Sequence, residues 1–278
     1  PMGTFTFKGV AYANQGAFLS GQNGGNNHHS MFKFKDKWYM TFVCYDGKGG
    51  NDGRGYETWL AESNDLLHWN ILGRILEFPS TSTPLWDANQ RGGFPALIDY
   101  EWNGSYKMGK YKGAHWMTYI GGNGTGYEAV QSPLSVGLAS TKKDITKPHP
   151  WQCLPHPVIS YADDDAQWWE QMTQYKSTIY KVEKKYFGHP FVMFYNAGGK
   201  DATHPKGERI GIALSDDMLH WTRFNGNPVF AHDSDGTITG DADSALIDSK
   251  EVTADVEGVL LSNINLRLIR DLENNGLI

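Results

Sequence analysis

Short apolar stretches recur along the chain in a fixed order, and they predict a sheet unit that occurs three times. In each unit a short apolar strand comes first, an aromatic strand second and a strand of small residues third. The aromatic strands are predicted at Lys37–Phe42, His115–Tyr119 and Phe191–Tyr195. Aromatic and β-branched residues suit a pleated, half-buried surface, so these segments should be buried strands.

The other strands of each unit frame the aromatic one. Candidate inner strands are Ser30–Phe34, Pro95–Ile98 and Ser177–Tyr180, and candidate third strands are Thr58–Ala61, Ser135–Ala139 and Ile210–Leu214. A four-stranded antiparallel unit of this kind is the blade of a β-propeller. A sandwich would also contain many short strands, but it would not repeat this order within each unit.

Each third strand ends in a turn that leads to a tryptophan. The turns Ser63–Trp69 and Ser215–Trp221 nearly duplicate each other, and a degenerate version at Ser140–Asp144 precedes Trp151. Ser and Asp side chains close such turns by bonding to nearby backbone groups. The tryptophan should begin the outermost strand, so these turn residues are predicted to be structural.

A fourth unit begins at Asp241–Asp248 and is not completed. Every Trp, Tyr and Phe precedes position 231, and Leu261–Leu277 has the pattern of a short amphipathic helix. We therefore expect an all-β fold of propeller type in residues 1–248, with three clear four-stranded blades plus the start of a fourth and an incomplete ring. Residues 249–278 are expected to be an atypical tail, either helical or truncated.

Composition narrows the function. The net charge is −6, which argues against nucleic acid or an anionic membrane as the main partner. No run of about eighteen apolar residues predicts a transmembrane helix. Two cysteines are too few for a disulfide framework. The chain opens Pro1-Met2-Gly3-Thr4 without a visible signal peptide.

The Ser-x-Asp-x-x-His-Trp turns resemble those of the five-bladed propeller glycosidases, which include glycoside hydrolase families 43, 32, 117 and 130. Asn26–Ser30 followed by Lys37–Tyr39 looks like a blade start of family 43 proteins. Glu208–Ala213 through Asn227–Val229 resembles a blade of family-43-like proteins, and Ile238–Asp241 looks like the opening of the next blade. The resemblance covers residues 20 to 248, and it implies five blades and a secreted or periplasmic enzyme.

The sequence departs from the catalytic pattern of family 43. That family typically carries an Asp-Pro base at the first inner strand, a middle Asp and a later Glu-Gly acid. Here the first inner strand is led by His28 and His29, the second by Arg91–Pro95 and the third by Gln174–Lys176. The catalytic residues of family 43 are therefore not transferred to this chain.

The geometry of propeller blades indicates other acidic residues as candidates for the catalytic carboxyls. Side chains just before the inner strands converge at one mouth of a propeller, and glycoside hydrolysis normally needs two carboxyl groups. Asp87 beside Trp86 and Glu170 beside Trp169 occupy parallel places, and Asp241 leads the fourth unit. A carboxyl next to an indole loses hydration, which raises its pKa and suits a general acid. Asp87, Glu170 and Asp241 are the catalytic candidates; the alternative is that they cap backbone amides.

A second set of residues is nominated for substrate binding. Glu57, Glu128 and Glu208 precede the third strands, and their repetition favours a structural role such as pairing with arginine. Glu128, close to the Gly-rich stretch 121–124, is the best functional candidate of the three, and Glu208 is kept beside it as a substrate-binding candidate.

Histidine and basic residues complete the candidate site. Adjacent residues of a strand face opposite sides, so either His28 or His29 should face the axis. There it could orient a sugar hydroxyl, bind a central ion or act as an acid, as family 117 enzymes are thought to do; the alternative is a hydrogen-bonded core histidine. Arg91 and Lys176 could bind an acidic sugar or a phosphate, or form salt bridges.

These observations predict an exo-acting, inverting glycosidase for a plant or algal oligosaccharide, with no required cofactor, although a central Ca²⁺ is compatible with the fold. One alternative is a phosphorylase like those of family 130, for which Arg91, Lys176 and Arg209 are the candidate phosphate ligands. Another is a sugar-binding propeller without catalysis. Open blade edges would also favour self-association.

Overall fold

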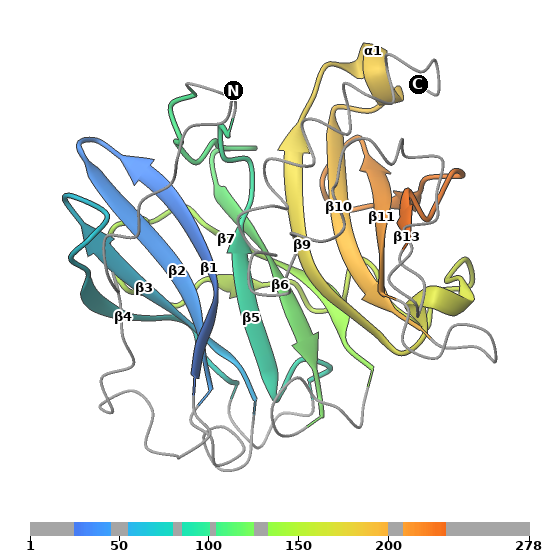
Figure 1. The fold of residues 1–278 in the computed structure, drawn as a ribbon, viewed down its shortest axis with the longest axis horizontal. Coiled ribbons are helices and arrows are strands. Elements are labelled where there is room, and N and C mark those ends of the chain that lie inside the picture. Colours follow the sequence, from blue (N-terminus) through green and yellow to red (C-terminus); the bar gives the residue numbers. More distant parts are fainter. Residues whose placement is uncertain are drawn as a thin grey trace, which may run out of the picture.

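The computed structural model describes residues 25–45, 55–79, 85–100, 104–124, 133–199 and 208–231. These residues form three antiparallel sheets, each of which follows the chain from an inner to an outer strand (Figure 1). Blade 1 contains β1 (Gly25–Phe34), β2 (Lys37–Tyr45), β3 (Glu57–Ser63) and β4 (Asn70–Leu76). Blade 2 contains β5 (Gln90–Pro95), β6 (His115–Gly122), β7 (Ser135–Thr141) and β8 (Gln152–Cys153).

Blade 3 contains β9 (Thr173–Lys181), β10 (Phe191–Gly198), β11 (Glu208–Ser215) and β12 (Thr222–Arg223). A short strand, β13 (Phe230–Ala231), also pairs with β11. The 3₁₀ turn η3 (Trp168–Glu170) precedes this blade, and the single-turn helix α1 (Lys184–Phe187) connects β9 to β10. The prediction of an all-β fold with three four-stranded blades is thus confirmed. The fourth unit at 241–248 and the tail at 249–278 lie outside the described residues.

The three blades share one internal packing rule. A methionine of each second strand lies opposite an alanine of the third strand, and all six side chains are buried. The small alanine leaves room for the long, flexible methionine, which fills irregular space well. The pairs are Met40 with Ala61, Met117 with Ala139 and Met193 with Ala213.

Apolar side chains join neighbouring blades into one body. Phe32, Leu60 and Ile75 of blade 1 pack in the same cluster as Met117 and Tyr119 of blade 2. A second cluster joins blade 2 to blade 3 and includes the fully buried side chains of Val136, Leu138, Ile179 and Met193. Burying a large apolar side chain contributes roughly 1.5–3 kcal/mol, so these two interfaces are the main apolar source of stability. The inner strands β1, β5 and β9 consequently lie next to one another (Figure 1).

The two duplicated turns have nearly identical hydrogen bonds. Ser215 Oγ accepts the backbone amides of Asp217 and Met218, and Asp217 Oδ1 accepts those of Leu219 and His220 at 2.9 Å each. Ser63 and Asp65 make the same four contacts in blade 1. The Trp69 and Trp221 indoles each donate to a backbone carbonyl of the turn. The predicted structural role of these turns is confirmed.

The second inner strand was placed wrongly by the sequence pattern. The segment Pro95–Ile98 was expected to form it, but β5 spans Gln90–Pro95. Leu97 has a positive φ of 59°, which does not belong to a regular strand. Arg91 is therefore part of the inner strand, and Gln174–Lys176 likewise lie within β9 instead of leading it.

Replacing Asp217 by Asn tests the turn. Hydrogen bonding from the backbone amide of His220 holds the pKa of Asp217 below its usual range. The carboxylate therefore stabilises the fold above about pH 4 and loses this effect as the pH falls further. We expect Asp217→Asn to cost about 1 kcal/mol of unfolding free energy at pH 6. Urea titrations should show this difference shrinking towards pH 2, and Asp36→Asn, which replaces an exposed turn residue, should change stability little at pH 6.

Candidate functional site

Asp87 lies at the boundary between blades 1 and 2, where a tyrosine and an arginine bind its carboxylate. The Tyr119 hydroxyl donates to Oδ2 at 2.8 Å and Arg91 Nη2 donates to Oδ1 at 3.0 Å. Arg91 also donates to the carbonyl of Glu77, just beyond β4. The Trp86 ring stacks on Tyr119, with ring centroids 5.7 Å apart. Asp87 is 2% exposed, so its carboxylate has almost no free surface.

Glu170 occupies the corresponding boundary between blades 2 and 3. The Tyr195 hydroxyl donates to Oε1 at 2.9 Å, and Arg223 Nε donates to the same oxygen at 2.7 Å. Oε2 accepts the backbone amide of Gln167 at 2.8 Å. The Trp169 ring stacks on Tyr195, with ring centroids 5.8 Å apart, as Trp86 does on Tyr119. Glu170 is 0% exposed.

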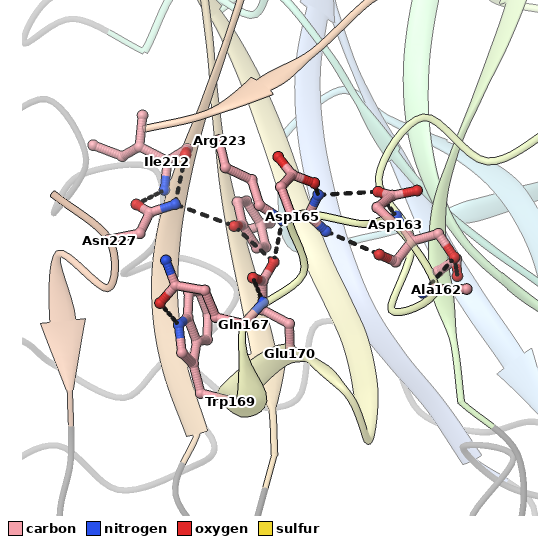
Figure 2. Close-up of polar contacts among 12 residues, drawn as sticks. Ala162, Asp163, Asp165, Gln167, Trp169, Glu170, Ile212, Arg223 and Asn227 are labelled. Atoms are coloured by element: carbon pink, nitrogen blue, oxygen red, sulfur yellow. Dashed lines mark hydrogen bonds and ion pairs between the residues drawn. The ribbon is translucent and has the colours of Figure 1, made fainter. Parts of the chain in front are cut away.

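Arg223 extends the second cluster across the blade boundary. Its guanidinium lies between Glu170 and the carboxylates of Asp163 and Asp165, as Figure 2 shows. It also donates to the backbone carbonyl of Ser160 at 2.9 Å. Because residues near 160 pair with β7 of blade 2, this one side chain ties the outer strand of blade 3 to blade 2.

Glycine in the third strand makes room for each tyrosine ring. Tyr119 lies opposite Gly137, and Tyr195 lies opposite Gly211. A Cβ on Gly137 would lie 2.3 Å from Tyr119, and one on Gly211 would lie 2.6 Å from Tyr195. Blade 1 has Phe42 opposite Trp59 at the same register, so it lacks this arrangement.

We call the two groups the boundary clusters: Trp86, Asp87, Arg91 and Tyr119 in one, and Trp169, Glu170, Tyr195 and Arg223 in the other. Each combines a buried carboxylate, a tyrosine hydroxyl and an arginine. Removing one partner of such a buried pair typically costs about 3–5 kcal/mol, because the other charge is left uncompensated. A general acid or base, by contrast, must reach the substrate. The geometry of Asp87 and Glu170 therefore fits a structural role, and Asp241 lies outside the described residues.

His28 lies where the inner strands meet, at a β-bulge. Asn27 pairs with Val43 and Ser30 with Thr41, so His28 and His29 together oppose the single residue Phe42. His28 has a positive φ of 52°, which is uncommon for a residue with a side chain. Bulges redirect side chains and positive φ values store strain, and both features are frequent at functional sites.

The surroundings of His28 keep its imidazole neutral. Its ring contacts Tyr56 and Phe94, with centroids 5.6 and 5.8 Å away. Burial, followed by the positive charges of Lys176 and His29, lowers the pKa of His28 to about 3. Its Nε2 is buried and has no hydrogen-bond partner among the residues that the structure describes. A neutral imidazole in this position can donate to, or accept from, a ligand hydroxyl.

Blade 3 carries a matching irregularity on its inner strand. Tyr195 pairs with Ser177 and Ala197 with Gln174, so Tyr175 and Lys176 oppose one residue of β10. The inner strands of blades 1 and 3 thus each carry a bulge, and the charge of Lys176 acts on His28. This brings His28 and Lys176, both nominated from the sequence, to one site.

The other residues nominated from the sequence lie elsewhere or have other partners. Arg91 is committed to Asp87, as the salt-bridge alternative predicted. His29 is exposed and stacks on Phe42. Glu208 begins β11, and Glu128 lies outside the described residues. Glu57 is buried and accepts a hydrogen bond from Arg74 at 3.1 Å, which agrees with the expected arginine pairing.

Within the described ranges, no group of three or more His, Cys, Asp and Glu side chains is arranged to hold a metal ion. No helix in the described part of the chain has the length and apolar character needed to cross a bilayer. The central Ca²⁺ stays a prediction.

Sequence reasoning missed several residues of this region. Tyr56 and Phe94 contact His28, although neither belongs to a recognisable motif. Gln174 is fully buried, and both polar atoms of its amide lack partners. Tyr56 directly precedes β3, whereas Phe94 and Gln174 lie within the inner strands β5 and β9, and no sequence motif marks them.

The pH dependence of stability tests the environment of His28. Its folded pKa lies below the value of 6.5 expected in the unfolded chain, so the unfolded state binds a proton first as the pH falls. Stability should therefore decline below pH 6.5 by up to about 1.4 kcal/mol per pH unit from this group alone. Urea titrations of His28→Gln should show a shallower decline between pH 6.5 and 4. His156→Gln, which replaces an exposed histidine, is the matched control.

Comparison with known proteins identifies solved structures that are similar to this chain. No family model matches the sequence. A solved structure named "Glycoside hydrolase" is 59% identical, with a TM-score of 0.72, and the match covers 76% of this chain and 60% of that one. A solved structure of a complex of BT0996 and RGII is 57% identical, with a TM-score of 0.74, and the match covers 81% of this chain and 62% of that one.

A more distant solved structure agrees in fold, and one further protein matches a short part of the sequence. A family 117 glycoside hydrolase of the marine bacterium Zobellia galactanivorans is 16% identical, with a TM-score of 0.57, over 80% of this chain and 61% of that one. An arabinoxylan arabinofuranohydrolase of Paenibacillus polymyxa is 37% identical over 68 residues, which are 24% of this chain and 10% of that protein. The chain spans about three fifths of the two similar solved structures. Its fold is that of the propeller-type glycoside hydrolases.

Proposed function

We propose that this chain is part of a glycoside hydrolase that removes terminal sugars from a plant or algal oligosaccharide. The observation that carries the proposal is the 59% and 57% identity to a glycoside hydrolase and to BT0996 in its complex with RGII. Such identity, maintained over more than three quarters of this chain, favours a shared class of substrate. An oligosaccharide derived from RGII is therefore the first substrate to test, and a secreted or periplasmic location would suit it.

The reacting carboxyl pair is proposed to lie outside the boundary clusters. Asp87 and Glu170 are buried, and both oxygens of each carboxylate already accept hydrogen bonds from the protein. Glu128, Glu208 and Asp241 remain from the acids nominated by sequence position. An inverting reaction would need two of them about 6.5–9.5 Å apart, with a water between them.

His28 is proposed to orient the substrate. Its neutral imidazole, with an unpartnered buried nitrogen, can bind a sugar hydroxyl that enters between the inner strands. The neighbouring rings of Tyr56 and Phe94 offer apolar surface for the C–H faces of a sugar. An exo-acting enzyme needs a closed end to its site, because only a chain terminus fits there.

A scan of acidic residues tests this proposal. Turnover of the RGII oligosaccharide should fall at least about a hundredfold in two of the variants Glu128→Gln, Glu208→Gln and Asp241→Asn, because each reacting carboxyl contributes by proton transfer or direct attack. Asp87→Asn should lower stability, but its folded fraction should retain turnover within about tenfold of the wild type. Product release would be measured by chromatography, with the folded fraction determined by circular dichroism.

The opposite pattern would overturn the assignment. If Asp87→Asn abolished turnover without loss of stability while the other three variants stayed active, Asp87 would be a reacting carboxyl. Binding of the oligosaccharide by the wild type without any product would indicate a sugar-binding propeller. Products that appear only when inorganic phosphate is present would indicate a phosphorylase.

A further inference from the structure

Arg209 is a buried cation for which the described chain supplies no anion. The residue is 4% exposed, and its Nη1 is buried without a hydrogen-bond partner. Among the described residues, no carboxylate forms an ion pair with it, in contrast to Arg91 and Arg223 of the boundary clusters. Burial of a charge without a partner is costly, which makes Arg209 a candidate for binding an external anion.

The environment of Arg209 is suited to a sugar. Its guanidinium carbon lies over the Trp168 ring, 4.5 Å from the ring centroid. Trp168 is 36% exposed, one of the few large apolar side chains that reach the surface. Aromatic rings bind the C–H faces of sugars, and guanidinium groups bind carboxylates through paired hydrogen bonds.

Gln174 adds polar groups on the same side of the sheet. Gln174 and Arg209 pair with Ala197 from its two sides, so the three residues form one row across β9, β10 and β11. Side chains of such a row project from the same face, about 10 Å apart at the outer positions. Ala197 is short and buried, so the longer side chains of Gln174 and Arg209 are not separated by a bulky group. Both polar atoms of the Gln174 amide are buried without partners.

We propose that Arg209, Trp168 and Gln174 form a subsite for a carboxylate-bearing sugar, with Arg209 binding the carboxylate and Gln174 a ring hydroxyl. The inference rests on the proposed function, and it narrows the substrate class to oligosaccharides that contain an acidic sugar. Inorganic phosphate could also bind a guanidinium, but it offers no apolar face for Trp168. The combination of a cation, an amide and an indole therefore favours the acidic sugar.

Binding of a monosaccharide tests this subsite without any cleavage. NMR titration of the full chain with D-glucuronate should give saturable shifts, whereas D-glucose should bind at least about tenfold more weakly. Arg209→Gln should weaken glucuronate binding at least about tenfold and Arg209→Lys less, because lysine keeps the charge but loses the paired geometry. Trp168→Ala should weaken binding several-fold. Arg74→Gln is the matched control, since Arg74 also lies over a tryptophan but has Glu57 as its own anion.

The outcomes separate this inference from the proposed function. Equal binding of glucuronate and glucose would overturn the subsite even if hydrolysis is observed. Unchanged glucuronate binding by the Arg209→Lys and Arg209→Gln variants, both of them folded, would overturn it as well. Saturable binding of phosphate with none of glucuronate would also overturn it. Arginine-dependent glucuronate binding would support the subsite even if no glycoside is cleaved.

Discussion

Burial of a carboxylate between two sheets is the constraint on which this structure depends. Asp87 and Glu170 cannot be buried alone, because an isolated charge in a protein interior is strongly disfavoured. Each is therefore matched by an arginine and a tyrosine hydroxyl, and the tyrosine ring in turn requires a tryptophan above it and a glycine beneath it. One ion pair thus fixes side chains from several strands, and it does so at both blade boundaries.

The remaining candidate residues for substrate binding lie outside the boundary clusters, and two of them, His28 and Lys176, are on the inner strands β1 and β9. The bulges in β1 and β9 lie at His28 and Lys176, and the neutral imidazole of His28 contacts the rings of Tyr56 and Phe94. Arg209 and Gln174 lie in the next part of blade 3 with unused polar atoms. In the boundary clusters the carboxylate oxygens accept hydrogen bonds, whereas His28, Gln174 and Arg209 each have a buried nitrogen without a partner among the described residues.

Much of the fold was predictable from sequence because it repeats. The aromatic strands, the third strands and the serine–aspartate turns recur with the same local pattern, and local patterns determine such elements. The second inner strand was misplaced because Arg91-Gly92-Gly93 reads as a loop, although these glycines are needed for close contact with Val43 and Met117. The bulges could not be predicted, since one extra residue leaves no mark in the hydrophobic pattern. The repeated Trp–acid pairs predict catalytic carboxyls, and the sequence does not show that Asp87 and Glu170 are buried against Arg91 and Arg223.

The central claim is that each buried carboxylate stabilises the fold by fixing an arginine that also bonds to the neighbouring blade. A double-mutant cycle between Glu170 and Arg223 tests it most directly, using Glu170→Gln, Arg223→Met and the double variant in urea titrations. Each single change should cost roughly 3–5 kcal/mol, and the double variant should cost at least about 1 kcal/mol less than their sum. Additive or negligible losses of stability, together with loss of turnover in a fully folded Glu170→Gln variant, would contradict the account.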